Sequence, residues 1–233
     1  MNTSSPLDTG ITNNNSSEFK DFRPNSDRAR NAQTLVWLVM VSSIVLIATT
    51  YLELDILERL KNGVGEYDEG IQAEAERSDS INQIATIIYF ILRIISAVFF
   101  IQWFRRAYYN ISNFSTPLLS DGWAAGAWFV PIFNWFRPYQ MMREMWQATT
   151  NQVGTDEFNE KGYNYKLNIG IWWTLWVIFA VLNNVILRFD QKSIDEITTA
   201  DNLSLIAHAL NIPLAIITVK IIKEYNKLEE QLS

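Results

Sequence analysis

Hydrophobic residues in this chain of 233 residues gather in long runs, and most of its charged residues lie between those runs. A helix rises about 1.5 Å per residue, so roughly 20 apolar residues cross a ~30 Å hydrocarbon core. Lipid also requires such segments to be helical, because every backbone polar group must find a partner within the segment. The pattern therefore predicts an all-α, integral membrane four-helix bundle, with spans at about residues 32–52, 81–104, 169–187 and 203–222.

A fifth apolar run, at about residues 123–136, is too short for a complete span. It contains Pro131, which removes a backbone hydrogen bond, and the polar Asn134, and it ends at Arg137. A run of about 14 residues is typical of a re-entrant or interfacial segment. If it crossed the membrane completely, the last two spans would be inverted and the C-terminal lysines would lie outside. We therefore predict four spans and one additional short broken segment.

The chain after this run has the spacing of an amphipathic helix. Tyr139, Met142 and Trp146 recur at steps of three and four residues, which suits a helix that lies at the membrane interface. The broken segment and the interfacial helix together occupy residues 123–151, on the cytoplasmic side. They serve either to pack that end of the bundle or to gate or bind something there.

The remaining chain divides into a polar tail and loops. Residues 1–31 form a cytoplasmic tail rich in Asn, Ser and Thr, which is expected to be disordered and carries no cleavable signal peptide near Met1. Residues 32–233 form the membrane domain. Its first outer loop, residues 53–80, carries nine acidic and three basic side chains. This loop is either a solvated loop with short helical extensions or a cation-binding loop, although its spacing shows no calcium-loop pattern.

Basic residues set the expected orientation. With the N-terminus inside, thirteen lysines and arginines lie in the cytoplasmic segments and five in the outer loops. Basic residues near membrane spans favour the cytoplasmic side. We therefore expect a multi-pass protein with both termini in the cytoplasm.

Composition excludes several kinds of chemistry. The chain has no cysteine and a single histidine, so a thiolate nucleophile, a disulfide and a His-rich metal site are excluded. No basic tract indicates nucleic acid. We expect no catalytic residue, metal or cofactor. The expected partners are membrane lipids, and an unidentified protein partner or a second copy of the chain is left open.

The most informative single residue is Arg93, at the middle of the second span. A charge at this depth costs at least ~2.5–3.5 kcal/mol and usually faces a bundle interior or a wet cavity. Asn82, Thr86, Tyr89 and Ser96 lie on the same helix face at steps of three and four residues. Together with polar residues of the last two spans, they give a candidate intramembrane polar site of Arg93, Tyr89, Ser96, Asn183, Asn184, His208 and Asn211.

No Asp or Glu lies well inside any span, so Arg93 has no carboxylate partner in the sequence pattern. Its expected partners are Asn side chains, carbonyls freed near Pro213 or Pro131, water, or a bound anion. Two interpretations follow. Arg93 could lie at the floor of a polar cavity for an anionic ligand or a lipid headgroup, or the polar groups could only hold helices together, at about 0.6–2 kcal/mol for each hydrogen bond. His208 is expected to be a packing residue.

A long motif follows the second span. The stretch Gln102 to Asn110, and then Gly122 to Trp146, resembles the bacterial membrane family known as domain of unknown function 4328 (DUF4328). The resemblance implies a bacterial inner-membrane protein and supplies no activity. The motif residues form a second candidate site, a platform made of Trp103, Arg106, Asn110, Trp128, Pro131, Asn134, Arg137, Pro138, Gln140, Glu144 and Trp146.

Helical spacing places Trp103, Arg106 and Asn110 on one face. Glu144 is expected to pair with an arginine or to accept from backbone donors near Pro138. The arginines could equally bind lipid phosphates, each worth about 1 kcal/mol near an anionic surface.

Three functions compete. The first is a non-enzymatic scaffold, sensor or regulatory module. The second is a small transporter or channel component with a ligand cavity at Arg93, although the two halves show no convincing internal repeat. The third and least favoured is a membrane enzyme, which would need a nucleophile, a base or a metal cluster that the sequence lacks.

Overall fold

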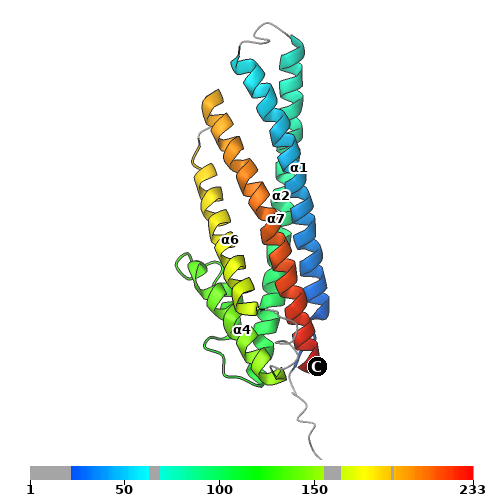
Figure 1. Ribbon diagram of the computed structural model, residues 1–233, viewed down its shortest axis with the longest axis vertical. Helices are drawn as coiled ribbons and strands as arrows, with labels where there is room; N and C mark the ends of the chain where they lie inside the picture. The colour runs from blue at the N-terminus through cyan, green and yellow to red at the C-terminus, as the bar shows by residue number, and fades with distance from the viewer. Residues whose placement is uncertain (1–21, 63–68, 155–163, 190–191, 233) are drawn as a thin grey trace, which may run out of the picture.

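The computed structural model describes residues 22–62, 69–154, 164–189 and 192–232, and this part of the chain contains helices and no strand. The long helices are α1 (Ser26–Lys61), α2 (Glu69–Asn110), α6 (Tyr165–Ile186) and α7 (Ile194–Glu229). The shorter elements are η1 (Ile111–Asn113), α3 (Asp121–Gly126), η2 (Phe133–Trp135), α4 (Arg137–Val153) and η3 (Glu230–Leu232). Figure 1 shows the long helices running side by side.

These four long helices are apolar and long enough to cross a membrane, which confirms the prediction of an all-α membrane bundle with four spans. At 1.5 Å per residue, the 22 residues of α6 extend about 33 Å, close to the thickness of the hydrocarbon core. The 42 residues of α2 extend about 63 Å. Therefore α2 projects well beyond the membrane, and its charged ends lie outside the apolar stretch.

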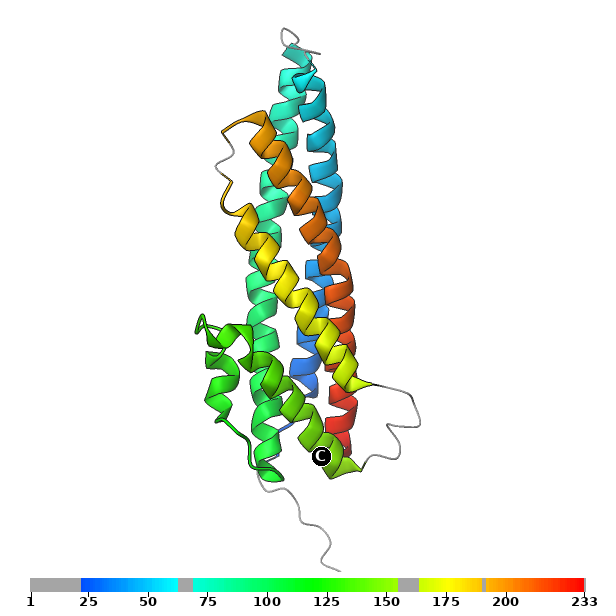
Figure 2. The same ribbon diagram turned by 60° about the vertical axis from the view of Figure 1, so that its left-hand side comes forward.

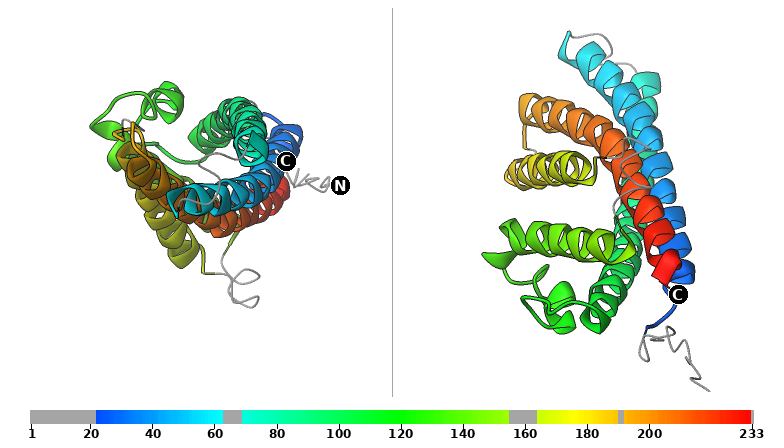
Figure 3. Two further views of the ribbon diagram at one scale, coloured as in Figure 1. Left: turned by 90° about the horizontal axis from the view of Figure 1, so that it is seen from above. Right: turned by 60° about the horizontal axis from the view of Figure 1, so that its bottom comes forward.

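The four helices form a curved row rather than a closed ring. α1 packs against both α2 and α7, and α7 packs against α6, so α2 and α6 lie at the two ends of the row. The segment from α3 to α4 contacts both of these end helices, α2 through α3 and α6 through α4. Seen from above, this segment lies beside the open side of the row (Figure 3). The short elements thus cover the gap between α2 and α6 at one end.

Local sequence explains where α7 and α4 begin and end. Ser193 caps α7 by accepting a hydrogen bond from the backbone N–H of Glu196 at 3.2 Å, a capping-box arrangement. α7 continues through Pro213. Pro138 lies in the first turn of α4, where its missing N–H has no helical partner to lose. Gly154 ends α4 with φ of 95°, a conformation that favours glycine.

The described part of the predicted tail differs from expectation. α1 begins at Ser26 rather than at residue 32, and the backbone N–H of Arg23 donates to Asn110 Oδ1 at 3.1 Å. The remaining tail residues, 1–21, lie outside the described residues. In the outer loop, α1 continues to Lys61 and α2 begins at Glu69, so the prediction of short helical extensions was wrong and the extensions are long.

The run at 123–136 is broken, as predicted. It contains the end of α3, a stretch of turns around Pro131 and the short helix η2, so no continuous helix crosses the membrane here. α4 is amphipathic, but its apolar face packs against the bundle. Met141, Met142, Met145 and Trp146 are completely or almost completely buried in the main hydrophobic core. Figure 2 shows α4 beside the lower end of α6, at the same end of the bundle as the C-terminus.

Candidate functional site

Trp128 fills the gap between α2 and α6. Its ring lies 5.7 Å from the ring of Phe100 and 6.2 Å from that of Phe104, both on α2. On the other side it lies 5.8 Å from Trp176 and 6.5 Å from Trp172, both on α6. Aromatic pairs at such separations add stability beyond the area that they bury. The broken segment therefore inserts one indole ring between α2 and α6, next to the direct contact of Phe100 with Trp172, whose ring centres are 6.0 Å apart.

Arg93 reaches across the same gap from α2 to α6. Its Nη1 donates to the hydroxyl of Tyr89 at 2.9 Å, one turn away on α2. Its guanidinium carbon lies 4.1 Å from the centre of the Phe179 ring on α6, a cation–π contact. These protein groups differ from the Asn side chains and proline-freed carbonyls that were expected. No carboxylate among the described residues forms an ion pair with Arg93.

Arg93 and the broken segment line one cavity of about 350 Å³. Such a volume lies within the range of small-molecule sites. Arg93 and Ser96 contribute from α2, and Thr218 from α7 forms part of the back wall. The other lining residues are mostly apolar or aromatic, and they include Val36, Val39, Ala97, Phe100, Ile101, Trp128, Phe129, Asn134, Trp172 and Trp176.

Two of the lining residues carry a polar atom that is closed off from solvent and has no hydrogen-bond partner within the described part of the chain: Asn134 Oδ1, an acceptor, and Trp128 Nε1, a donor. A buried polar group without a partner costs about 1–3 kcal/mol. The cavity therefore combines one cation, Arg93, with mostly apolar walls, and two of its lining side chains hold a buried polar atom without a partner.

The other residues of the predicted intramembrane site are not all gathered here. The His208 ring lies edge-on to Tyr89, with ring centres 5.1 Å apart, so it adjoins the Arg93 cluster. Asn211 donates to Ser43 Oγ at 2.7 Å and links α7 to α1. Asn183 and Asn184 donate to carbonyls of their own helix, at 2.7 and 2.8 Å. The predicted site therefore separates into the Arg93 cluster, one interhelical bond and two helix-internal bonds.

Below the cavity, a buried carboxylate joins three parts of the chain. Glu229, 3% exposed at the end of α7, accepts from Asn110 Nδ2 at 2.6 Å and from Asn25 Nδ2 at 3.1 Å. Asn110 also donates to the carbonyl of Arg23 at 2.9 Å. Asn25 stands at the N-cap of α1, yet its side chain makes this long-range bond instead of capping the helix. We call Asn25, Asn110 and Glu229 the terminal cluster.

Burial raises the pKa of Glu229 from 4.5 to about 7, although the bonds from Asn110 and Asn25 and the nearby Arg106 oppose this shift. Glu229 lies seven residues beyond the apolar stretch of α7, outside the spanning segment. The terminal cluster thus contains a carboxyl group that changes its charge near neutral pH.

Glu144 has partners different from those predicted. It accepts from the Tyr108 hydroxyl at 2.7 Å and from the backbone N–H of Leu118 at 2.7 Å, rather than pairing with an arginine or with donors near Pro138. Burial and this bond to Glu144 raise the pKa of Tyr108, which therefore remains protonated. Glu144 holds the loop before α3 against α4.

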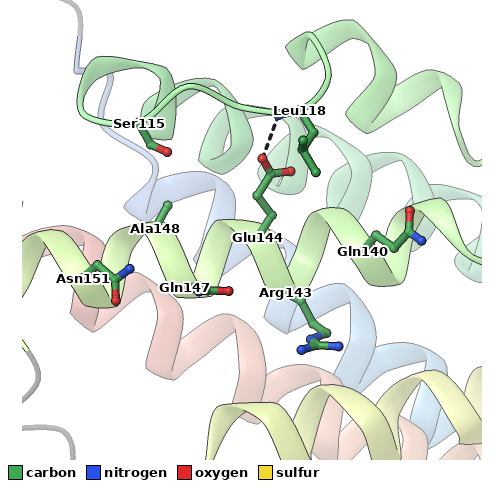
Figure 4. Close-up of a pocket in the computed structure, with 8 residues that line it drawn as sticks. All are labelled: Ser115, Leu118, Gln140, Arg143, Glu144, Gln147, Ala148 and Asn151. Atoms are coloured by element: carbon green, nitrogen blue, oxygen red, sulfur yellow. Dashed lines mark hydrogen bonds between the residues drawn. The ribbon is translucent and has the colours of Figure 1, made fainter.

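Glu144 also lines a pocket of about 370 Å³ on the outer side of α4 (Figure 4). Gln140, Arg143, Gln147 and Asn151 line it from the same helix, and Ser115 and Leu118 line it from the loop. In contrast to the Arg93 cavity, six of the eight residues that line this pocket are polar or charged, and we call it the polar pocket of α4.

The remaining motif residues stabilise the platform. Arg137 lies against the rings of Phe133 and Phe136, at 5.6 and 5.3 Å, and donates to Gln140 Oε1 at 3.1 Å. Trp146 stacks on Tyr165 with ring centres 5.5 Å apart, and Trp103 meets Tyr225 edge-on at 5.9 Å.

A model of the family described as "Domain of unknown function (DUF4328)" matches residues 69–227, well over half of the chain. The chain belongs to the DUF4328 family. No curated protein and no solved structure matches the chain.

Within this DUF4328 chain, the motif residues fall into three places. Trp128 and Asn134 line the Arg93 cavity, Gln140 and Glu144 line the polar pocket of α4, and Asn110 belongs to the terminal cluster. The DUF4328 motif thus connects a cavity at membrane depth to a surface at the end of the bundle.

Sequence reasoning missed Glu229, which lies in a charged C-terminal stretch typical of a solvated helix end. One signal could have identified it: Ile222, Tyr225 and Glu229 follow one another at steps of three and four residues, so Glu229 continues the buried face of α7. The partners Phe179, Trp172 and Trp176 were missed because nothing in the sequence states that α6 faces Arg93.

Proposed function

We propose that this DUF4328 protein is a non-enzymatic sensor or regulatory module. Occupancy of its membrane cavity changes the conformation of the α3–α4 segment. One observation carries the proposal: Arg93, at the middle of a span, lines the same cavity as Trp128 and Asn134 of the broken segment. An occupant of this cavity would contact membrane helices and the broken segment at once.

The connection from the cavity to the surface is short. Asn134 lies in η2, and α4 begins three residues later at Arg137. α4 then carries Glu144, which holds the loop before α3, and the polar face that lines the second pocket. A ligand shifts a conformational equilibrium only if it binds the two states with different affinity. An occupant that contacts Trp128 and Asn134 can bind two positions of the broken segment with different affinity.

We place this module in the bacterial inner membrane with both termini in the cytoplasm. The excess of lysine and arginine in the corresponding segments supports this orientation. The polar pocket of α4 would then face the cytoplasm, where a protein partner could bind it.

The test mimics occupancy without assuming a ligand. Ala97 lines the cavity and Ala48 lies on an exposed face of α1, so Ala97→Phe and Ala48→Phe add the same side chain inside and outside the cavity. The chain lacks cysteine, so Gln147→Cys provides one thiol on the exposed face of α4. We expect Ala97→Phe, but not Ala48→Phe, to change the rate at which a water-soluble maleimide labels this thiol in nanodiscs.

Equal labelling rates in the two phenylalanine variants would overturn the proposed coupling between the cavity and α4. Solute flux into proteoliposomes that requires Arg93 would instead support a small transporter or channel component.

A further inference from the structure

We infer that the Arg93 cavity binds an anionic amphiphile from the bilayer, with an oxyanion head against Arg93 and an apolar chain along the aromatic walls. This inference rests on the proposed function, because it names the occupant of the same cavity.

The charge of the cavity defines the head of the ligand. The protein contacts of Arg93 are the hydroxyl of Tyr89 and the face of Phe179, which leave its positive charge without a neutralising carboxylate in the described ranges. A cationic ligand would be repelled, and a neutral ligand would leave the charge uncompensated. A guanidinium presents several N–H donors in a fork that matches the oxygens of phosphate or carboxylate.

The polar atoms without protein partners refine this choice. Trp128 Nε1 and Asn134 Oδ1 are closed off from solvent as these side chains lie, so a ligand reaches them only if the side chains move; Nε1 can then donate to an oxyanion, whereas Oδ1 requires a donor. A phosphate monoester that retains one proton offers both acceptor oxygens and an O–H. We therefore expect a phosphate head to form hydrogen bonds with more of these polar groups than a carboxylate does.

The position of the cavity explains the apolar chain. Trp172 and Trp176 are seven and eleven residues beyond Tyr165, so they lie about 10 and 16 Å along α6 from its beginning. This depth is within the hydrocarbon core. α1 and α7 close the back of the cavity, and Phe129, 77% exposed, lines its rim. The part of the side between α2 and α6 that Trp128 and the short elements leave uncovered, beside Phe129, would then face lipid, and a ligand with an apolar chain could enter there.

The experiment measures thermal unfolding of the full chain in phosphatidylcholine nanodiscs with three probes. Monododecyl phosphate combines the oxyanion with a chain, inorganic phosphate has the oxyanion alone, and dodecylphosphocholine has the same chain with a zwitterionic head. We expect monododecyl phosphate to raise the unfolding temperature and the other two probes to leave it unchanged.

Two substitutions connect binding to the cavity. Arg93→Leu should weaken the apparent affinity for monododecyl phosphate about tenfold or more, as expected for the loss of a charge-assisted hydrogen bond. Lys61→Leu is the matched control, because it removes one positive charge from the exposed end of α1. The control should retain the affinity of the unsubstituted chain.

Asn134→Asp covers the case in which Arg93→Leu fails to fold. It adds a carboxylate to the lining with almost no change in shape, so it should abolish the stabilisation by monododecyl phosphate in a folded protein. Unchanged stabilisation in Asn134→Asp would overturn the inference.

The probes also separate the possible failures. If inorganic phosphate stabilised the protein and this effect required Arg93, the ligand would be a soluble oxyanion, and the inference of a membrane amphiphile would be wrong. If dodecylphosphocholine stabilised the protein as much as monododecyl phosphate does, or if no probe stabilised it, the inference of an oxyanion head would be wrong. None of these results depends on labelling at Gln147, so a cavity that binds but transmits nothing contradicts only the proposed function.

Discussion

Glu229 shows how one buried carboxyl group joins the described beginning and end of the chain. Its carboxyl group is held by Asn25 before α1 and Asn110 at the end of α2, and Arg106 is the nearby cation that lowers its pKa. Two neutral donors and one partly buried arginine do not offset the loss of water, so the pKa of Glu229 is raised to about 7 and the protonated form is favoured below that pH. The terminal cluster is therefore most stable when Glu229 is neutral.

The sign of the pH dependence follows from this shift. The pKa of Glu229 is about 7 in the folded chain, against 4.5 for an ordinary Glu, so between these values the folded state binds more protons. The contribution of Glu229 to stability is fully present below pH 4.5 and decreases by about 3 kcal/mol as pH rises through 7. Glu229→Gln, which cannot ionise, should lose this part of the dependence, measured as unfolding temperature against pH. If the unfolding temperature of Glu229→Gln depended on pH as that of the unsubstituted chain does, other groups would cause the pH dependence.

Among the elements, the short α3–η2 segment carries the ring that lies between α2 and α6. α2 and α6 lie at the ends of the helix row, and Trp128 contacts aromatic rings on both. Pro131 and Asn134 interrupt the backbone just beyond it. The segment can therefore insert one ring between the two helices without itself becoming a span.

Trp128→Ala should destabilise the protein by about 3 kcal/mol, the lower value for removing an indole from a packed site. Phe129→Ala is the matched control, because the neighbouring ring is 77% exposed and its removal should cost less than about 0.5 kcal/mol. Unfolding in mixed micelles measures both. Equal effects would contradict the role of Trp128 between α2 and α6.

The sequence predicted the elements better than their partners, for a physical reason. Span length, the break at Pro131 and the amphipathic spacing of α4 depend on residues close in the chain, so they could be predicted locally. The partners of Glu144 depend on how the loop before α3 returns, which places Tyr108 and the N–H of Leu118 beside it. Similarly, the contact of Phe179 with Arg93 depends on how α6 packs against α7, which residues close in the chain do not determine.

At the scale of the whole molecule, the helix row has two different ends. One end holds the described beginning and end of the chain together with α3 and α4 (Figure 1). The other holds the long extensions of α1 and α2, where Asn82 joins Glu53 and Thr49. The excess of basic residues at the first end supports a cytoplasmic position for it.

Single cysteines in this cysteine-free chain test that orientation. An impermeant thiol reagent added to intact cells should label Asn62→Cys and Lys192→Cys. It should label Asn151→Cys and Gln231→Cys only after permeabilisation. Labelling of Asn151→Cys in intact cells would invert the predicted orientation.

The central claim is that the cavity shared by Arg93, Trp128 and Asn134 is a binding site. The most direct measurement is an electron cryomicroscopy map of the chain extracted into nanodiscs with the lipids of its own membrane. The account predicts non-protein density that contacts the guanidinium of Arg93 and continues between α2 and α6. A well-resolved cavity that contains only water, or side chains packed into this space, would contradict it.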